Sequence, residues 1–156
     1  MGLSRMAPGR VMTVEPDCTL AEAARLMHML CIGALVITEP GGGKPIGIVT
    51  DRDLVTRIGA GADPSGEDLR SFTERTLHSL PGDAGRREAI ASMKAHGVRR
   101  LPLLDEAGHL VGLVSLDDLL LELAQELGGE LTLVADAIRA GFAEEIHTPS
   151  AHERAL

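Results

Sequence analysis

Aromatic residues are almost absent from this sequence. Among its 156 residues there are two Phe and no Trp or Tyr. Proteins that stack nucleic-acid bases on aromatic side chains need several of them, so this class of binding protein is excluded. The core must instead be filled by aliphatic side chains. Because 44% of the residues are hydrophobic, such a core can be large enough to fold.

Cysteine and positive charge are also scarce. Cys18 and Cys31 form no Cys-x-x-Cys motif, which favours small buried thiols in a reducing compartment over disulfides. The net charge of −8 disfavours general binding to nucleic acid or to an anionic membrane. No apolar run approaches the roughly 20 residues of a membrane span, and no signal peptide is visible. We therefore expect a soluble cytoplasmic protein with no nucleic-acid or membrane partner.

Patterns of catalytic and metal-binding residues are absent as well. The six histidines form no His-x-x-x-His pair, and none lies at zinc-site spacing from a cysteine. No Ser-His-Asp or Cys-His arrangement is legible. We therefore expect no catalytic residues, no metal and no required cofactor.

What the sequence does contain is an internal repeat. GIVTDRD begins at Gly47 and GLVSLDD begins at Gly112, 65 residues later, and both read Gly, two apolar residues, a hydroxyl, two variable residues and Asp. Flanking matches, such as Pro16 with Pro81, occur at spacings of 65 or 66. One unit of about 50 residues is too small for a secure core, so two copies first serve stability.

Each copy has the pattern of a helix, two strands and a second helix. Thr19 and Glu22 have the spacing of a capping box before a helical apolar stripe. Residues 34–37 and 46–49 predict antiparallel strands, and the helix after Thr50 should end near 59–61. In the second copy the strands are expected at 101–104 and 110–114, and its first helix lacks a clear capping box. Residues 60–70 are expected to form a polar link.

The repeated hydroxyl and aspartate allow two interpretations. Thr50 with Asp53, and Ser115 with Asp118, match a capping box and would then be purely structural. However, a glycine inside a strand often marks close approach by a ligand or by another backbone. A helix N-terminus also attracts anions. The hydroxyl can donate to a phosphate there, while the carboxylate accepts from two ribose hydroxyls, and one helix terminus can serve both roles.

Several stretches together resemble a tandem pair of CBS domains, the module named after cystathionine β-synthase. They are VMTVEPDCTLAEAARLM, IGALVI and GIVTDRDL in the first copy, and EAIASM, HGVRRLPLLD and GHLVGLVSLDDLL in the second. The resemblance covers about residues 8–127 and implies the α+β class, with two pseudo-symmetric βαββα repeats, sheets packed face to face, and an extra C-terminal helix. The expected boundaries are 8–62 for the first repeat, 63–70 for a linker, 71–127 for the second repeat, 128–148 for a helical extension and 149–156 for a disordered tail.

The resemblance also implies two clefts between the repeats that bind an adenosine-containing ligand. Thr50 and Asp53 would mark one cleft, and Ser115 and Asp118 the other, with the hydroxyl near phosphate and the aspartate on the ribose. The adenine would be bordered by the segments 13–14 and 77–78 and by the strand starts at 33–34 and 99–100. The implied ligand-binding residues are Thr13, Val14, Ala34, Thr50, Arg52, Asp53, His78, Arg99, Arg100, Ser115 and Asp118.

The arginines leave the ligand open. Arg99 and Arg100 stand where the first copy has Gly33 and Ala34, so the clefts are expected to be unequal. These arginines and Arg52 either contact phosphates or lie in solvent and pair with acidic residues. Phosphate contacts would favour AMP, ADP or ATP. Arginines that point away would favour S-adenosylmethionine, and NAD is a less favoured ligand.

The expected role is that of a stand-alone regulatory protein, a homodimer in which the ligand shifts the packing of the repeats and an effector protein reads the shift. The alternative is a structural or dimerisation module that binds no ligand, in which the signatures are only capping boxes. The tail from about Leu119 to Thr148 is expected to be largely helical, with an apolar stripe that breaks at Gly128-Gly129 and resumes up to Ile146. This stripe either covers its own core or docks on a second subunit or a partner.

Overall fold

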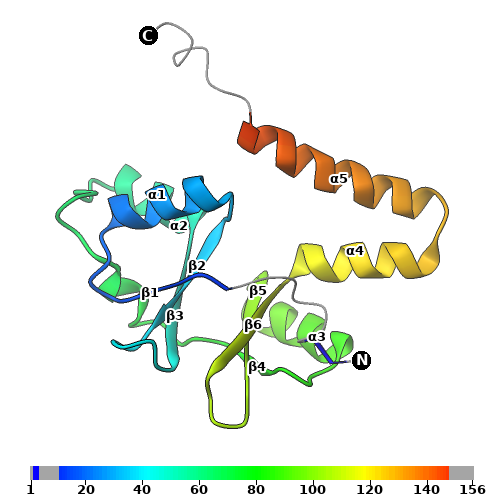
Figure 1. The fold of residues 1–156 in the computed structure, drawn as a ribbon, viewed down its shortest axis with the longest axis horizontal. Coiled ribbons are helices and arrows are strands. Elements are labelled where there is room, and N and C mark those ends of the chain that lie inside the picture. The colour runs from blue at the N-terminus through cyan, green and yellow to red at the C-terminus, as the bar shows by residue number, and fades with distance from the viewer. Residues whose placement is uncertain (1, 4–10, 148–156) are drawn as a thin grey trace, which may run out of the picture. The chain divides into compact units, whose positions relative to one another are not determined.

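The computed structural model describes residues 2–3 and 11–147, and the chain divides into two compact units after Leu116 (Figure 1). The first unit contains both repeats up to the end of the last strand. The second unit contains the C-terminal helices. The predicted disordered tail, 149–156, lies outside the described residues. Among the residues that the structure does describe, no helix is both long enough and apolar enough to cross a membrane.

The first repeat forms a three-stranded sheet with two helices. Its elements are β1 (Thr13–Val14), α1 (Leu20–Leu30), β2 (Ala34–Thr38), β3 (Pro45–Thr50) and α2 (Asp51–Gly59). In the sheet β2 is central, with β1 parallel and β3 antiparallel to it. The two predicted strands and both helices of this copy are confirmed, because their turn residues and apolar spacing specify them locally.

The second repeat follows the same plan. β4 (Leu80–Pro81), α3 (Arg86–His96), β5 (Arg100–Leu104) and β6 (Leu110–Ser115) give a second sheet with the order β4-β5-β6 and the same strand directions. Even the register is repeated: Ala34 pairs with Thr50 in the first hairpin, and Arg100 pairs with Ser115 in the second. The predicted α+β class and internal repeat are therefore confirmed.

The ends of α1 explain the state of the two cysteines. Thr19 and Glu22 form the complete capping box, and Cys31 ends the helix in the left-handed conformation with φ of 54°. Both thiols are free, but Cys31 is exposed, so the prediction of buried cysteines was wrong for this residue, which the helix end turns outward. Cys18 is half-buried, and burial, with Glu22 and Asp17 nearby, raises the pKa of its thiol.

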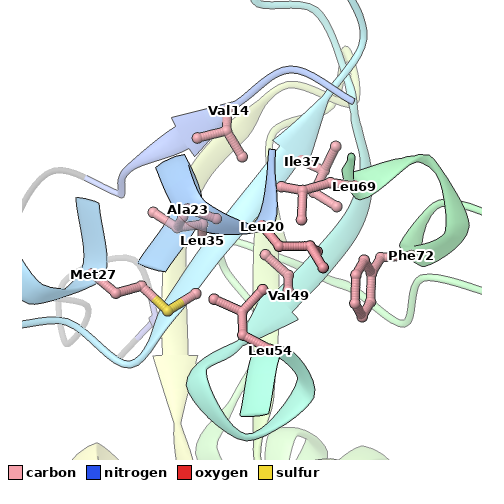
Figure 2. Close-up of a cluster of buried hydrophobic side chains, with 10 residues drawn as sticks. All are labelled: Val14, Leu20, Ala23, Met27, Leu35, Ile37, Val49, Leu54, Leu69 and Phe72. Carbon is pink, nitrogen blue, oxygen red and sulfur yellow. The ribbon is translucent and has the colours of Figure 1, made fainter. Parts of the chain in front are cut away.

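The core of the first repeat is aliphatic, as the composition requires. Figure 2 shows side chains from α1, α2, β2 and β3 meeting in one cluster. Leu20, Leu35, Ile37 and Val49 are fully buried within it. The cluster consists of Val14, Leu20, Ala23, Met27, Leu35, Ile37, Val49, Leu54, Leu69 and Phe72.

Two members of this cluster lie where the expected polar link meets the expected start of the second repeat: Leu69 falls in the link, 63–70, and Phe72 falls just after it. The short 3-10 helix η2 (Leu69–Phe72) places Leu69 and Phe72 in the first repeat's core, with exposures of 0% and 6%. The backbone N–H of Leu69 donates to the carbonyls of Pro16 and Cys18, each at 3.0 Å. The end of the expected link and the first residues of the expected second repeat therefore pack on the first repeat. A single leucine and a single phenylalanine in a polar stretch gave no periodic signal of this packing.

The second unit is a pair of helices, α4 (Leu116–Leu127) and α5 (Glu130–His147). The predicted break at Gly128 and Gly129 is confirmed, and both glycines have positive φ, at 66° and 65°. The Thr132 hydroxyl donates to the carbonyl of Ala124 at 3.3 Å across the turn. Leu120, Leu127, Leu131 and Val134 are exposed on this unit. What covers the apolar stripe stays a prediction.

Candidate functional site

The first signature lies where β3 ends and α2 begins. The backbone N–H of Asp53 donates to Thr50 Oγ1 at 3.2 Å. In return, Asp53 Oδ2 accepts from the Thr50 N–H at 3.0 Å and from the Thr50 hydroxyl at 2.5 Å. Both halves of the capping box are therefore present. The same arrangement holds a hydroxyl and a carboxylate side by side at a helix N-terminus.

The second oxygen of Asp53 has a different neighbour. Arg75 Nη1 lies 3.7 Å from Asp53 Oδ1, and the Arg75 guanidinium lies 5.8 Å from the centre of the Phe72 ring. Sequence reasoning missed Arg75, because an isolated arginine in a polar segment carries no motif. Its closeness in sequence to Phe72 has a meaning only once Phe72 is known to be buried.

The start of each hairpin lies beside the signature hydroxyl. Ala34 stands opposite Thr50, and Arg100 stands opposite Ser115, in the same register position of the two sheets. Arg100 also reaches the first repeat: its Nη2 lies 3.2 Å from the position that a Cβ would occupy at Gly33. Asp51 Oδ2 lies 3.3 Å from that same position. The absence of a side chain at Gly33 thus leaves room for Arg100 beside the first signature.

The other two predicted arginines lie at the start of α2 and just before β5. Arg52 is exposed in the first turn of α2, where its backbone N–H donates to Asp51 Oδ1 at 2.7 Å. Arg99 is exposed just before β5, and its carbonyl accepts from the Leu116 N–H at 2.8 Å. Arg100 comes from the second repeat, and its guanidinium lies beside Gly33 of the first repeat.

The side chains of Thr13 and Val14, which were predicted to border the adenine, lie in different environments. The Val14 side chain belongs to the first core, so only its backbone is available to border a ligand. Thr13 is exposed and lines a hollow of about 550 Å³ together with Thr38, the turn glycines Gly42 and Gly43, and His109. Of the described residues that line this hollow, Thr13 is the sole predicted ligand residue. The hollow is therefore separate from the signature residues.

The predicted counterpart of this border in the second repeat needs a correction. Val14 pairs with Ile37, whereas Leu103, which occupies the place of Ile37, pairs with Leu80. Leu80 is thus the counterpart of Val14, two residues later than the predicted His78. A two-residue strand has no periodicity from which the sequence could fix its register. His78 instead stacks on His96, with ring centroids 3.7 Å apart.

The glycine of the first signature is explained by the protein's own backbone. A Cβ at Gly47 would lie 3.1 Å from the carbonyl oxygen of Phe72 and 3.2 Å from Ile37 Cδ1. Of the two interpretations of a strand glycine, close approach by another backbone therefore holds here. Gly47 lets η2 lie against β3, and this contact carries Phe72 and the following residues towards α2.

The second signature occupies the equivalent chain positions. Ser115 is the last residue of β6, and Asp118 lies in the first turn of α4, as Thr50 and Asp53 do in β3 and α2.

Within the described ranges 2–3 and 11–147, no group of three or more His, Cys, Asp and Glu side chains is placed to hold a metal ion.

These features define a tandem-repeat α+β protein in which each repeat has a hydroxyl and an aspartate where a strand meets a helix. The family model of the CBS domain matches residues 6–60 and 69–125, which is more than half of the chain. The chain therefore belongs to the CBS domain family and contains a pair of these domains.

Two relatives illustrate the similarity in sequence. The chain is 36% identical over 110 residues to the CBS domain-containing protein YhcV of Bacillus subtilis, covering 70% of this chain and 76% of that protein. It is 33% identical over 121 residues to the uncharacterized protein MK0525 of Methanopyrus kandleri. That match covers 77% of this chain and spans 61% of the relative's length.

Two solved structures share the fold. The CBS domain protein PAE2072 from Pyrobaculum aerophilum, complexed with AMP, is 22% identical with a TM-score of 0.70, and the match covers 80% of this chain and 99% of that one. The CBS domain pair of protein MJ0100, in complex with 5-methylthioadenosine and S-adenosyl-L-methionine, is 18% identical with a TM-score of 0.68, covering 83% and 98%. At these identities the likeness establishes the fold.

Proposed function

We propose that this protein binds an adenosine-containing ligand between its two CBS repeats and that an effector protein responds to the bound state. The observation that carries the proposal is the first signature, in which Thr50 and Asp53 lie side by side at the start of α2. The same residue types recur at the same chain positions in the second repeat. Binding of AMP and of S-adenosylmethionine by proteins of the same fold supports this class of ligand.

The proposed roles follow from the chemistry of each group. The carboxylates of Asp53 and Asp118 accept hydrogen bonds from ribose hydroxyls. The hydroxyls of Thr50 and Ser115 donate to phosphate, beside helix N-termini whose amides and dipole favour an anion. The backbone at 13–14 and the strand start at Ala34 border the adenine of the first cleft. Arg99 stays a proposed contact of the second cleft, and the backbone at Leu80, the counterpart of Val14, takes the place first given to His78.

The candidate ligands are AMP, ADP, ATP and S-adenosylmethionine. Arg100 favours the phosphate-bearing ligands for the first cleft, because its guanidinium lies near Gly33 and the start of α2. Guanidinium groups form forked, charge-assisted bonds with phosphate, whereas they repel a positively charged sulfonium. Arg52 is exposed, and it joins such a site only if its side chain turns towards the ligand.

The regulatory part of the proposal concerns the consequence of binding. A ligand that contacts both repeats shifts their packing only to the extent that it binds one arrangement more tightly than the other. We propose that a homodimer presents this shift to an effector protein, and that the chain itself performs no catalysis and requires no cofactor or metal.

Calorimetric titration of the purified, nucleotide-free protein with AMP, ADP, ATP and S-adenosylmethionine tests the proposal. Asp53→Glu and Asp118→Glu are the informative variants, because a capping box accepts Glu whereas a ribose seat has no room for the longer side chain. We expect at least one of them to lose binding while its melting temperature stays close to that of the wild type. Asp17→Glu, at an exposed residue outside both signatures, is the matched control.

The geometry of the first capping box also favours the alternative of a structural module, since Asp53 already satisfies two donors of Thr50. In that case no ligand of the series gives heat or raises the melting temperature. The Asp→Glu variants would then change stability alone, and the proposal of a ligand sensor would be withdrawn.

A further inference from the structure

The two oxygens of the Asp53 carboxylate are in unequal positions. Oδ2 accepts from both the backbone N–H and the hydroxyl of Thr50, at 3.0 and 2.5 Å, so it is occupied by the capping box. Oδ1 faces Arg75 at 3.7 Å, a separation that is an ion pair but longer than a hydrogen bond. A ribose hydroxyl that donates to Asp53 Oδ1 must therefore displace the Arg75 guanidinium.

The backbone that leads into Arg75 is held in place by the first core. Leu69 and Phe72 are buried in the first core, and the carbonyl of Phe72 lies against Gly47 of β3. The Phe72 ring also lies beneath the Arg75 guanidinium at 5.8 Å, within the range of a cation–π contact. The side chain itself is 74% exposed, against 31% for Asp53. The backbone before Arg75 is therefore fixed by packing, while its exposed guanidinium has room to reorient.

We propose that Arg75 determines the specificity of the first cleft for ligands that carry a phosphate. This inference rests on the proposed function of the cleft. In the empty protein the guanidinium neutralises Asp53 Oδ1. When ribose hydroxyls take that oxygen, the guanidinium moves to the phosphate held beside Thr50. Adenosine displaces Arg75 without offering it a new partner, whereas AMP does offer one.

Charge explains why a local arginine is needed at this place. The protein has a net charge of −8, and Asp51 and Asp53 both lie in the first turn of α2. A phosphate near these carboxylates is repelled unless a cation lies between them. Arg75 is the cation that the structure pairs with Asp53, whereas Arg100 lies on the side of Gly33 and Asp51.

The test compares AMP with adenosine in the Asp118→Ala background, so that the second signature does not contribute. The measured quantity is the ratio of the adenosine Kd to the AMP Kd by calorimetry. We expect Arg75→Gln to lower this ratio about tenfold, the factor that corresponds to one charge-assisted hydrogen bond. Arg70→Gln is the matched control, because Arg70 lies on the same segment, is exposed and pairs with Asp68 instead. It should leave the ratio unchanged.

The outcomes separate this inference from the proposed function. A threefold or larger fall in the ratio for Arg75→Gln, with none for Arg70→Gln, supports the role of Arg75. A smaller fall, an equal fall in both variants, or absence of AMP binding in the Asp118→Ala background while the wild type binds overturns it and leaves the proposed function standing. If the wild type binds neither ligand nor any other of the series, the proposed function fails as well.

Discussion

The two repeats share one chain plan, but they secure their first helices differently. α1 begins with the full Thr19–Glu22 capping box, whereas α3 begins at Gly85 without any side-chain cap. At the other end the order is reversed, because α1 ends on Cys31 with φ of 54° and α3 ends on Gly97 with φ of 65°. The left-handed conformation disfavours a side chain but suits glycine. Each copy therefore has one favourable helix end and one costly end.

The repeats also differ in how their cores are completed. The first core includes Leu69 and Phe72, which follow the repeat in the chain and lie on η2. Gly47 makes room for this segment against β3. The first repeat thus depends on residues outside its own helix–strand pattern, and the same residues bring Arg75 to Asp53. The packing of η2 on the first core therefore also places Arg75 beside Asp53.

The largest expected effect comes from removing the contribution of the link to the first core. We expect Leu69→Ala to lower the free energy of unfolding by about 3 kcal/mol, since a fully buried leucine leaves a cavity when truncated. Urea unfolding measures the change. Val55→Ala, at a side chain that is 72% exposed on α2, should change it by less than about 0.5 kcal/mol. Equal effects of the two substitutions would contradict the role given to η2.

The C-terminal ends of α1 and α3 allow two opposite substitutions, because one carries Cys31 and the other Gly97. We expect Cys31→Gly to raise the free energy of unfolding by about 1 kcal/mol, and Gly97→Ala to lower it by about as much. A Cβ at Gly97 would meet nothing within 4 Å, so the loss reports the backbone conformation alone. Thermal unfolding followed by circular dichroism measures both changes. A loss of stability in Cys31→Gly would show that the thiol has a role beyond the helix end.

A capping side chain at the start of α3 should raise the free energy of unfolding, because Gly85 supplies none. Gly85→Ser introduces a hydroxyl with Glu88 at the third helical position, which completes the capping-box pattern. Because Ser exceeds Gly as an N-cap by only a few tenths of a kcal/mol, we expect a gain of about 0.3 kcal/mol. Gly85→Ala adds a methyl group in open space but no acceptor, so it should lower stability. A gain from alanine equal to that from serine would exclude capping as the cause.

The smallest expected effect is the pH dependence of the first cap. The hydrogen bonds that Thr19 donates from its backbone and its hydroxyl lower the pKa of Glu22 below its ordinary value of 4.5. A lowered folded-state pKa means that the contribution is present above pH 4.5 and is lost as the pH falls through the lowered value. In Glu22→Gln the stability deficit relative to the wild type should therefore shrink on acidification.

Unfolding midpoints measured from pH 7 downwards test this expectation. Glu106→Gln, at an exposed residue in the second hairpin turn, serves as the control and should show no such convergence. The second repeat also has a carboxylate whose pKa is lowered by a backbone hydrogen bond, Asp105 in that turn. The His109 N–H, which donates to Asp105 Oδ1 at 2.8 Å, lowers the pKa of Asp105. A deficit in Glu22→Gln that stays constant with pH would contradict the assignment of the Thr19 contacts.

Features that depend on a few neighbouring residues were predictable from the sequence. The Thr19 cap, the two hairpins, the missing cap at Gly85 and the break at Gly128 each follow from hydrogen bonds or backbone preferences within one or two turns. The doubled signature likewise needs only its own seven residues to be recognised. The register of β4 was not predictable, because the pairing partner of a two-residue strand lies far along the chain.

By itself the sequence determined the repeat, the order of its elements and the residue types offered at the start of α2. Periodicity and capping are local, so they can be read one segment at a time. The tertiary structure alone decided that Leu69 and Phe72 complete the first core, that Gly47 accommodates a backbone, and that Arg75 stands at Asp53. These contacts join segments that share no local pattern, and the burial of apolar side chains selects them only when the whole first unit folds.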